Sequence, residues 1–319
     1  MLGQVNELVC GVIAIAFVLC GVGFSMQDWG VDPGKHHITD GVHDSTWGTW
    51  VTGYMLGALG VVFGIAAPGE GLVRNVVRFA FELDGISWIA RSAMHQFFWQ
   101  GGDVHDMLWF TSVAFFAGGM FGKACAAHMF VQEMGMCNCF GVSDVRSFGM
   151  EHDAAAQLHA QHMPTAKIFG GAGLFAAIAI PVITLFQPLV GGWMNFVLVQ
   201  GLALCLTIGF GVAGGAYCGS VGMLLGFAGT MFFKHVSVPP FEYSSDFNDH
   251  GLAHACWMLC TASSYALLLQ LFAQIMLARE QVEQEKRRRR EEEALLATRE
   301  AEELEAQRAA KASCWGCAR

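Results

Sequence analysis

The sequence predicts an all-α integral membrane protein with about seven transmembrane helices, followed by a long charged helix. The first observation is composition: 54% of the 319 residues are hydrophobic and only 14% are charged, against about 25% charged in a soluble domain. The second is a series of apolar windows about as long as a membrane span. The third is a sharp change to charged residues after residue 278. We therefore expect a transmembrane domain over 1–278 and a soluble helical arm with a Cys-containing tail over 279–319.

Seven windows have the length and apolar character of a span, which needs about 20 residues. They are 8–26, 48–67, 104–122, 168–190, 193–213, 215–233 and 252–278. The residues before the first window include Glu7 and no Lys or Arg, so we expect a retained span and no cleaved signal peptide. Gly214-Gly215 separates the fifth and sixth windows and predicts either a tight hairpin or one broken element.

The segment 71–99 differs from the seven windows because it carries charge at helical spacing. Arg74, Arg78 and Glu82 lie four residues apart and share one helix face. Apolar residues occupy the other face: Val73, Val76, Val77, Ala80 and Leu83. This pattern predicts an amphipathic helix lying in the membrane interface. The alternative is an eighth span with a buried polar stripe, which would reverse the sidedness of one end of the chain.

The segment 279–311 is rich in strong helix formers and contains neither Gly nor Pro. Glu283 precedes Arg287 by four residues, and Glu285 precedes Arg289 by four, so opposite charges stack along one helix. The few apolar residues keep no heptad register, which argues against a coiled coil. We expect either a single solvated helix that continues the last span or a docking arm for a partner subunit.

Basic residues near membrane ends indicate the orientation of the chain. Seven spans place the two termini on opposite sides, and the basic run from Lys286 to Arg290 favours the C-terminal arm in the cytoplasm, or in the matrix of a mitochondrion. The formal net charge of −9 gives no reason to expect a nucleic acid partner.

A candidate metal site lies at the start of the last span. His250 and His254 are four residues apart and share a helix face, the spacing with which two imidazoles bind one zinc ion. His105 and His95 lie on the same predicted side of the membrane and complete the candidate ligands. Asp106 and Asp249 are the candidate catalytic carboxylates. The alternative is that these are ordinary residues of the wet headgroup region.

The pattern resembles the superfamily of seven-span zinc hydrolases that includes alkaline ceramidases and adiponectin receptors. His250-x3-His254 matches the His pair of that superfamily's last span, and Asp106 could stand for its carboxylate. The Ser-x3-His element of that superfamily, in which the two residues are four apart, is not matched here, because Ser92 precedes His95 by three residues. The resemblance implies a zinc-activated water that hydrolyses a lipid-like substrate.

A second group of histidines and cysteines lies on the opposite predicted side. It comprises His36, His37, His43, His128, Cys137, Cys139, His152, His159 and His162. Such residues can bind zinc or copper, but a solvated His-rich loop is the alternative that we favour. Cys314 and Cys317 form a Cys-x2-Cys pair, expected in a flexible tail.

The functional prediction is a non-catalytic accessory or scaffolding subunit of a membrane assembly. The centres of the seven windows contain no His, Asp, Glu, Lys or Arg, whereas haem proteins and coupled ion pumps keep such residues there. The expected partners are membrane lipids and other membrane subunits, contacted through the transmembrane surface and 279–311. The alternative is the zinc-dependent hydrolase, and a third is a small-molecule transporter or channel using the Gly-rich stretch 209–229.

Overall fold

The computed structural model describes residues 47–67, 71–97, 102–134, 154–235 and 247–316. The described residues are helical apart from short turns and contain no strand. The chain divides into two compact units, Met1–Ile275 and Met276–Arg319. The predicted first span, 8–26, falls outside the described residues.

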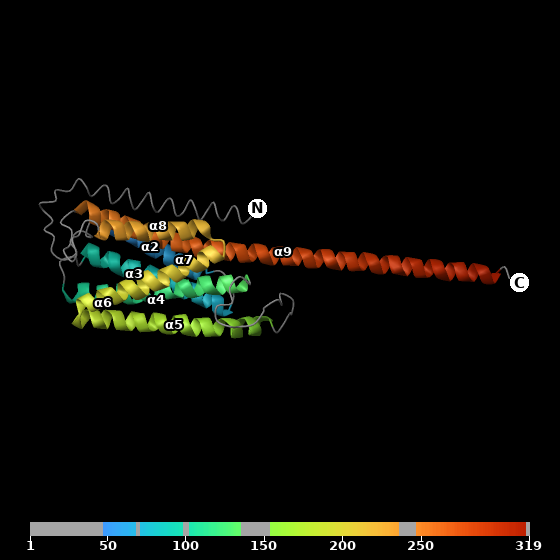
Figure 1. Cartoon of the computed structure of the whole chain (residues 1–319), viewed down its shortest axis with the longest axis horizontal. Coiled ribbons are helices and arrows are strands. Elements are labelled where there is room, and N and C mark those ends of the chain that lie inside the picture. Colours follow the sequence, from blue (N-terminus) through green and yellow to red (C-terminus); the bar gives the residue numbers. More distant parts are fainter. Residues whose placement is uncertain (1–46, 68–70, 98–101, 135–153, 236–246, 317–319) are drawn as a thin grey trace. The chain divides into compact units, whose positions relative to one another are not determined.

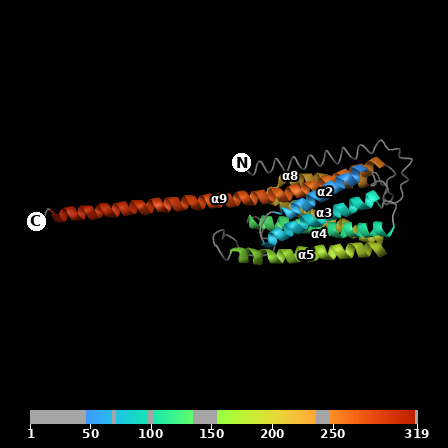
Figure 2. The ribbon, with the colours of Figure 1, turned by 180° about the vertical axis from the view of Figure 1, so that it is seen from behind.

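The first unit is a bundle of helices in which each long helix runs back along its predecessor (Figures 1 and 2). Its elements are α2 (Trp47–Ile65), α3 (Gly71–Phe97), α4 (Asp103–Glu133), α5 (Ala154–Phe186), α6 (Pro188–Met194), the π-helix η4 (Asn195–Ala203), α7 (Leu204–Ala213), α8 (Tyr217–His235) and the first part of α9 (Phe247–Gly316). Six of the seven predicted windows therefore coincide with observed helices.

The helix boundaries follow from residues that start or stop helices. Gly102 precedes α4 with a φ of 106°, and Asp103 and Asp106 occupy the first turn, where carboxylates favour the positive end of the helix dipole. Pro188 begins α6, a position where its missing N–H costs nothing. Gly215 has a φ of +78° in the short turn between α7 and α8, so of the two alternatives the tight hairpin is observed.

Glycines let the helices of the bundle approach closely. A Cβ on Gly85 of α3 would lie 2.7 Å from the carbonyl oxygen of Gly57 of α2. A Cβ on Gly226 of α8 would lie 2.6 Å from the backbone nitrogen of Cys260 of α9. Small residues of this kind are typical of helix interfaces in membranes, where backbones pack directly against each other.

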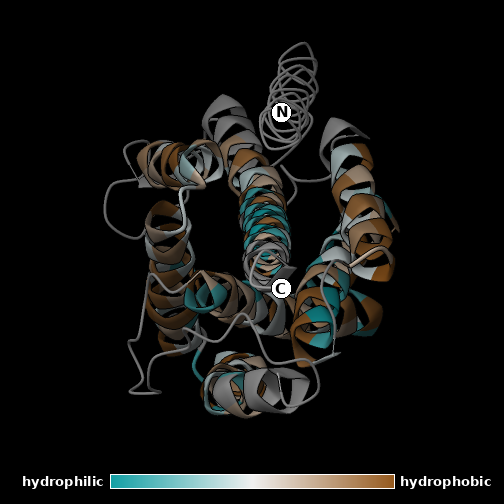
Figure 3. Ribbon diagram, turned by 90° about the vertical axis from the view of Figure 1, so that its right-hand side faces the viewer, coloured by the Kyte–Doolittle hydropathy of each residue, from teal (hydrophilic) through white to brown (hydrophobic). Residues whose placement is uncertain are grey.

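Four segments are long and apolar enough to cross a membrane: Asp103–Glu133, His162–Phe186, Val190–Ala213 and Cys256–Leu277. Two shorter apolar segments are Trp50–Ile65 and Tyr217–Phe232. Large apolar side chains such as Phe175 of α5, Val197 of η4 and Leu225 of α8 are more than half exposed. Brown, hydrophobic residues are frequent along the helices of the bundle in Figure 3. These features are consistent with an integral membrane protein.

The helix α3 packs inside the bundle, between α2 and α4 along its length. Its middle residue, Asp84, is fully buried, as are Val77 and Phe81. Arg74 and Arg78 are exposed, while Val73, Val77 and Ala80 are buried, so the two faces of this helix lie as the amphipathic pattern predicts. The buried face packs against other helices of the bundle and also carries Asp84.

The second unit contains the charged part of α9. Its described residues are mostly exposed, and the helix surface carries ion pairs three or four residues apart, including Lys286–Glu283, Arg288–Glu285 and Arg289–Glu285. The helix continues without a break to Gly316, as the composition of 279–311 predicts.

Candidate functional site: a buried charge centre

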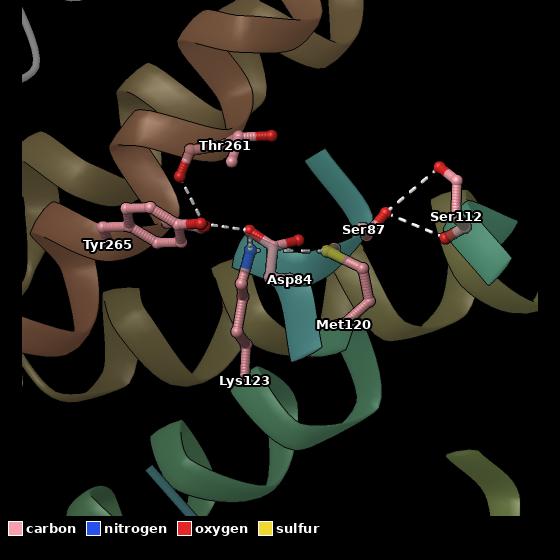
Figure 4. Close-up of polar contacts among 8 residues, drawn as sticks. Asp84, Ser87, Ser112, Met120, Lys123, Thr261 and Tyr265 are labelled. Atoms are coloured by element: carbon pink, nitrogen blue, oxygen red, sulfur yellow. Dashed lines mark hydrogen bonds and ion pairs between the residues drawn. The ribbon is translucent and has the colours of Figure 1, made fainter. Parts of the chain in front are cut away.

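Three side chains from three helices meet inside the first unit (Figure 4). Asp84 comes from α3, Lys123 from α4 and Tyr265 from α9. The Lys123 Nζ lies 2.9 Å from Asp84 Oδ2, and both side chains have no exposed surface. The Tyr265 hydroxyl donates a hydrogen bond of 2.5 Å to the same oxygen. We call these three residues the charge centre.

The surroundings of the charge centre are apolar and aromatic. The Lys123 Nζ lies 4.9 Å from the centroid of the Tyr265 ring, a distance at which a cation is attracted to the ring face. It also lies 3.9 Å from Met120 Sδ. The rings of Phe81 and Phe63 pack edge-on against Tyr265, with centroids 5.0 and 6.1 Å away. The ammonium and carboxylate therefore depend mainly on each other for compensation.

Glycine backbones close the charge centre on two sides. A Cβ on Gly60 of α2 would lie 2.7 Å from the Tyr265 hydroxyl oxygen, and a Cβ on Gly119 of α4 would lie 2.9 Å from the Asp84 backbone nitrogen. Even a methyl group would force the helices apart at these points. The local packing thus leaves the charged groups facing one another and not an open substrate site.

One acceptor of the charge centre is left without a partner among the described residues. Asp84 Oδ1 is buried and accepts no hydrogen bond. A buried polar atom of this kind costs about 1–3 kcal/mol. One turn further along α3, Ser87 Oγ donates to the Ser112 carbonyl oxygen of α4 at 2.8 Å, so polar contacts continue between the same two helices.

The charge centre can fix how three helices fit together. An isolated charge in an apolar interior is strongly disfavoured, whereas a hydrogen-bonded pair of opposite charges is tolerated. Any slide of α3 along α4 that separates Asp84 from Lys123 would leave both charges uncompensated. The pair therefore favours one register of α3 against α4. The hydrogen bond from Tyr265 to Asp84 fixes the register of α9 against α3 in the same way.

The predicted metal site receives no support from the described side chains. His105 Nδ1 lies 3.0 Å from Asp106 Oδ1 on the surface of the first turn of α4. His250, His254 and Asp249 fall in α9 and His95 in α3, but their side chains lie outside the described part of the structure. Among the described residues, no three His, Cys, Asp or Glu side chains are placed to bind one metal ion.

Two histidines of the second predicted group are buried and not part of a solvated loop. His128 of α4 has no exposed surface, and His162 of α5 is 1% exposed. His162 Nδ1 lies 3.2 Å from Gln132 Oε1, and Thr165 Oγ1 lies 3.4 Å from His128 Nδ1. The loop prediction is wrong for these two residues, because α4 runs to Glu133 and α5 begins at Ala154. The remaining members of the group and the C-terminal cysteine pair cannot be placed. Outside the described residues lie His36, His37, His43, Cys137, Cys139, His152 and Cys317, as do the side chains of His159 and Cys314.

The sequence carried two signals of the charge centre. Asp84 follows Ala80 by four residues, so it lies on the apolar face of the helix 71–99 and places a charged residue there. The apolar run of the third window continues beyond Lys123 to Val131, although the predicted span ends before this lysine. The third window ended too early, because the candidate span continues to Glu133 and Lys123 lies ten residues inside the C-terminal end of α4.

Comparisons with known proteins give no relative: no protein family, no curated protein and no solved structure matches this chain.

Proposed function

We propose that the chain is a non-catalytic structural subunit of a larger membrane assembly. The observation that carries this proposal is the closed charge centre. Its carboxylate, ammonium and hydroxyl are engaged with one another, and the backbones at Gly60 and Gly119 pack directly against them. Such a centre supports a fixed arrangement of helices more readily than it supports substrate turnover.

The outward surface supports the same proposal. Only 28% of the apolar window of α5, and 28% of that from α6 to α7, is buried inside the bundle, against 67% for α4 and 72% for α9. Such an apolar surface is covered either by lipid or by another membrane protein. We propose both membrane lipids and other membrane subunits as partners. The charged part of α9 offers a second contact region of the opposite character.

The packing of α3 also supports a revised topology. A crossing α3 would give eight spans together with the predicted span 8–26, and both termini would then lie on one side. That side would hold Arg74, Arg78, Arg146, Lys167, Arg279 and the run from Lys286 to Arg290, while the other would hold Lys35, Arg91 and Lys234. Because basic residues prefer the cytoplasmic side, both termini are proposed to face the cytoplasm or the mitochondrial matrix.

Photo-crosslinking through native cysteines tests the assembly proposal. Cys205 of α7 and Cys218 of α8 are exposed, whereas Cys125 and Cys260 are buried. A thiol-directed benzophenone attached in native membranes should crosslink Cys205 and Cys218 to the same few membrane proteins. Replacing both residues by Ser removes these crosslinks and provides the control. Crosslinks to lipid alone, with no protein adduct from either position, would contradict the proposal.

A proton-coupled transporter is the second candidate, and the unpartnered Asp84 Oδ1 is the observation that favours it. Ionisable groups among membrane helices often mark proton pathways. This candidate predicts proton flux into proteoliposomes that Asp84→Asn abolishes while the protein stays folded. Equal proton flux from wild type and Asp84→Asn would show that Asp84 does not couple transport to protons, and would contradict this candidate.

A further inference from the structure

Two neighbouring leucines interrupt the charged surface of the second unit. Leu295 and Leu296 are 58% and 57% exposed, in a part of α9 whose described residues are otherwise mostly charged or small. Isolated apolar side chains on a protein surface are common. The feature that distinguishes this pair is therefore the arrangement of the charges around it.

Four charged residues share a helix face with the two leucines. Arg288 and Glu292 lie seven and three residues before the first leucine. Arg299 and Glu303 lie three and seven residues after the second leucine. Residues three, four and seven apart lie on one face of an α-helix, and all four side chains are exposed. Along this face the order is thus positive, negative, two leucines, positive, negative.

The same order in the reverse direction carries the opposite sign at every charged position. In a second copy that runs antiparallel, with a two-fold axis between the leucines, Glu303 lies opposite Arg288. Arg299 of that copy lies opposite Glu292. Each contact occurs twice, because a two-fold interface uses the same surface of both chains. A parallel copy in register would instead place each charge against its own counterpart of the same sign, which is unfavourable.

From this pattern we propose that residues 288–303 bind the same residues of a second copy of this chain in the antiparallel direction. We call 288–303 the pairing segment. The leucines form the apolar centre of the contact, and the charges on either side select the direction and the register. The pairing rests on the proposed role in an assembly and adds a second copy of the chain to its members.

The contacts within α9 leave Arg288 able to bind a second carboxylate. Its Nη2 lies 3.0 Å from Glu285 Oε1, and its Nε lies 3.8 Å from Glu292 Oε1. The side chains of Arg288 and Glu292 are 65% and 64% exposed, and such exposed ion pairs are weak. A guanidinium group has five N–H donors, so an approaching carboxylate of the partner can bind beside these two.

The pairing segment is short, and the contact is accordingly weak and sensitive to salt. As a helix it is about 24 Å long, so the contact needs no heptad register sustained along the rest of α9. Exposed ion pairs contribute little individually and are screened by salt. Anchoring in a membrane raises the effective concentration of the two segments, which favours pairing of anchored chains.

Sedimentation of the full-length protein in mild detergent at low salt tests the pairing, since two micelles can take either direction relative to each other. Wild type should dimerise. Arg288→Glu should weaken dimerisation about tenfold, because both contacts with Glu303 become repulsive. The double variant Arg288→Glu/Glu303→Arg should restore it, because an antiparallel pair again has opposite charges in contact.

The matched control changes the same charge on the other side of the helix. Arg290 is exposed and lies two residues from Arg288, so it points away from the face that carries the leucines. Arg290→Glu should dimerise as wild type does. A parallel pair would give a different pattern, because exchanging Arg288 and Glu303 leaves each charge facing its own sign.

Chemical crosslinking gives a direct signal that does not depend on disrupting the segment. Arg288→Lys keeps the positive charge and supplies an amine that a carbodiimide joins to a carboxyl group in contact with it. In a mixture of isotopically labelled and unlabelled chains, mass spectrometry should find an amide between position 288 of one chain and Glu303 of the other. A parallel pair in register would hold these positions about 22 Å apart.

Three results would overturn the pairing: a monomeric wild type at low salt, undiminished dimerisation of Arg288→Glu, or crosslinked chains without the amide between position 288 and Glu303. The crosslinks expected from Cys205 and Cys218 report on the transmembrane surface and not on the pairing segment. They would persist if the pairing failed, so failure of the pairing is distinguishable from failure of the proposed assembly.

Discussion

The charge centre buries two opposite charges, those of Asp84 and Lys123, inside the bundle. Asp84 and Lys123 have no exposed surface, so neither can use water to compensate its charge. The net worth of such a pair is small, but the cost of breaking it is large, because the remaining charge is left uncompensated. Single and paired substitutions should therefore have very different effects.

Lys123→Met should destabilise the protein by about 3–5 kcal/mol, since it leaves the Asp84 carboxylate alone in an apolar interior. The double variant Asp84→Asn/Lys123→Met should recover most of this loss, because Asn is uncharged and its carbonyl still accepts from Tyr265. Thermal unfolding in one detergent, followed by tryptophan fluorescence, compares the variants. If the double variant is as unstable as the sum of the two single variants, the pair is not coupled as described.

Tyr265→Phe separates the hydrogen bond from the aromatic packing. The ring contacts with Phe63 and Phe81 stay, while the donor to Asp84 Oδ2 is lost. A loss of about 1–3 kcal/mol is expected, the cost of leaving a buried acceptor less satisfied. The same unfolding assay measures it, and an unchanged or higher melting temperature would show that the hydroxyl contributes nothing.

At the scale of elements, close glycine contacts hold α2 on α3 and α8 on α9. These contacts depend on the absence of a side chain and not on any interaction that a side chain makes. Gln270 of α9 adds a polar contact, since its Oε1 accepts from the Gly219 backbone N–H at 3.1 Å in the first turn of α8. That N–H has no partner within its own helix.

Gly85→Ala should weaken the bundle far more than the same change at Gly170. The new methyl on Gly85 would lie 2.7 Å from the Gly57 carbonyl oxygen, so α2 and α3 must separate, whereas nothing lies within 4 Å of a Cβ on Gly170. We expect a loss of at least about 2 kcal/mol at Gly85, as for an overpacked core. At Gly170 we expect no loss, or a gain of about 0.5–1 kcal/mol from helix propensity. Equal melting temperatures of the two variants would contradict the packing described for α2 and α3.

The charged part of α9 should respond to acid through Glu285. Hydrogen bonds from Arg288 and then Arg289 hold the pKa of this carboxyl below its ordinary value. A lowered folded pKa contributes stability above the unfolded pKa of about 4.3, and this contribution is lost as the pH falls through the folded value. Circular dichroism of a 276–316 peptide should show higher helicity than its Glu285→Gln variant at pH 7.

That advantage in helicity should disappear in acid, once the pH has fallen through the lowered pKa of Glu285 and the carboxyl is protonated. It should also shrink in 1 M salt, which screens exposed charges. Equal helicity of the two peptides at pH 7 and low salt would show that these ion pairs do not support the helix.

The sequence predicts most of the helices of this chain, because a long apolar window or a long run of alternating charges forms few structures other than a helix. The windows 48–67, 168–190 and 215–233 each coincide with a helix, and the charged helix follows from composition alone. The third window ended too early, since a lysine within an apolar run is usually taken as a membrane boundary. Only the partner Asp84, 39 residues earlier in sequence, explains why Lys123 is buried.

The charge centre was not predictable as a site for the same reason. Asp84, Lys123 and Tyr265 share no motif, and their contact depends on how three helices pack. The predicted site residues were chosen by local spacing, which identifies His250 and His254 as neighbours on one helix face but cannot identify contacts between helices. Spacing along one helix thus predicts elements better than it predicts sites.

At the scale of the whole molecule, the first unit pairs Asp84 with Lys123 in its interior and leaves apolar surface outside for lipid or protein. The proposed role in an assembly depends on that outward surface, while the charge centre keeps the helices in register. Loss of register should therefore abolish assembly, and restored register should restore it.

The native mass of the protein, measured after purification from its own membranes in mild detergent, tests this account most directly. Wild type and Asp84→Asn/Lys123→Met should both be recovered in one complex much heavier than the 34.5 kDa chain, with the same partners in fixed stoichiometry, whereas Lys123→Met should be lost from it. A folded wild-type protein that is recovered as a monomer, without any stoichiometric partner, would contradict the account.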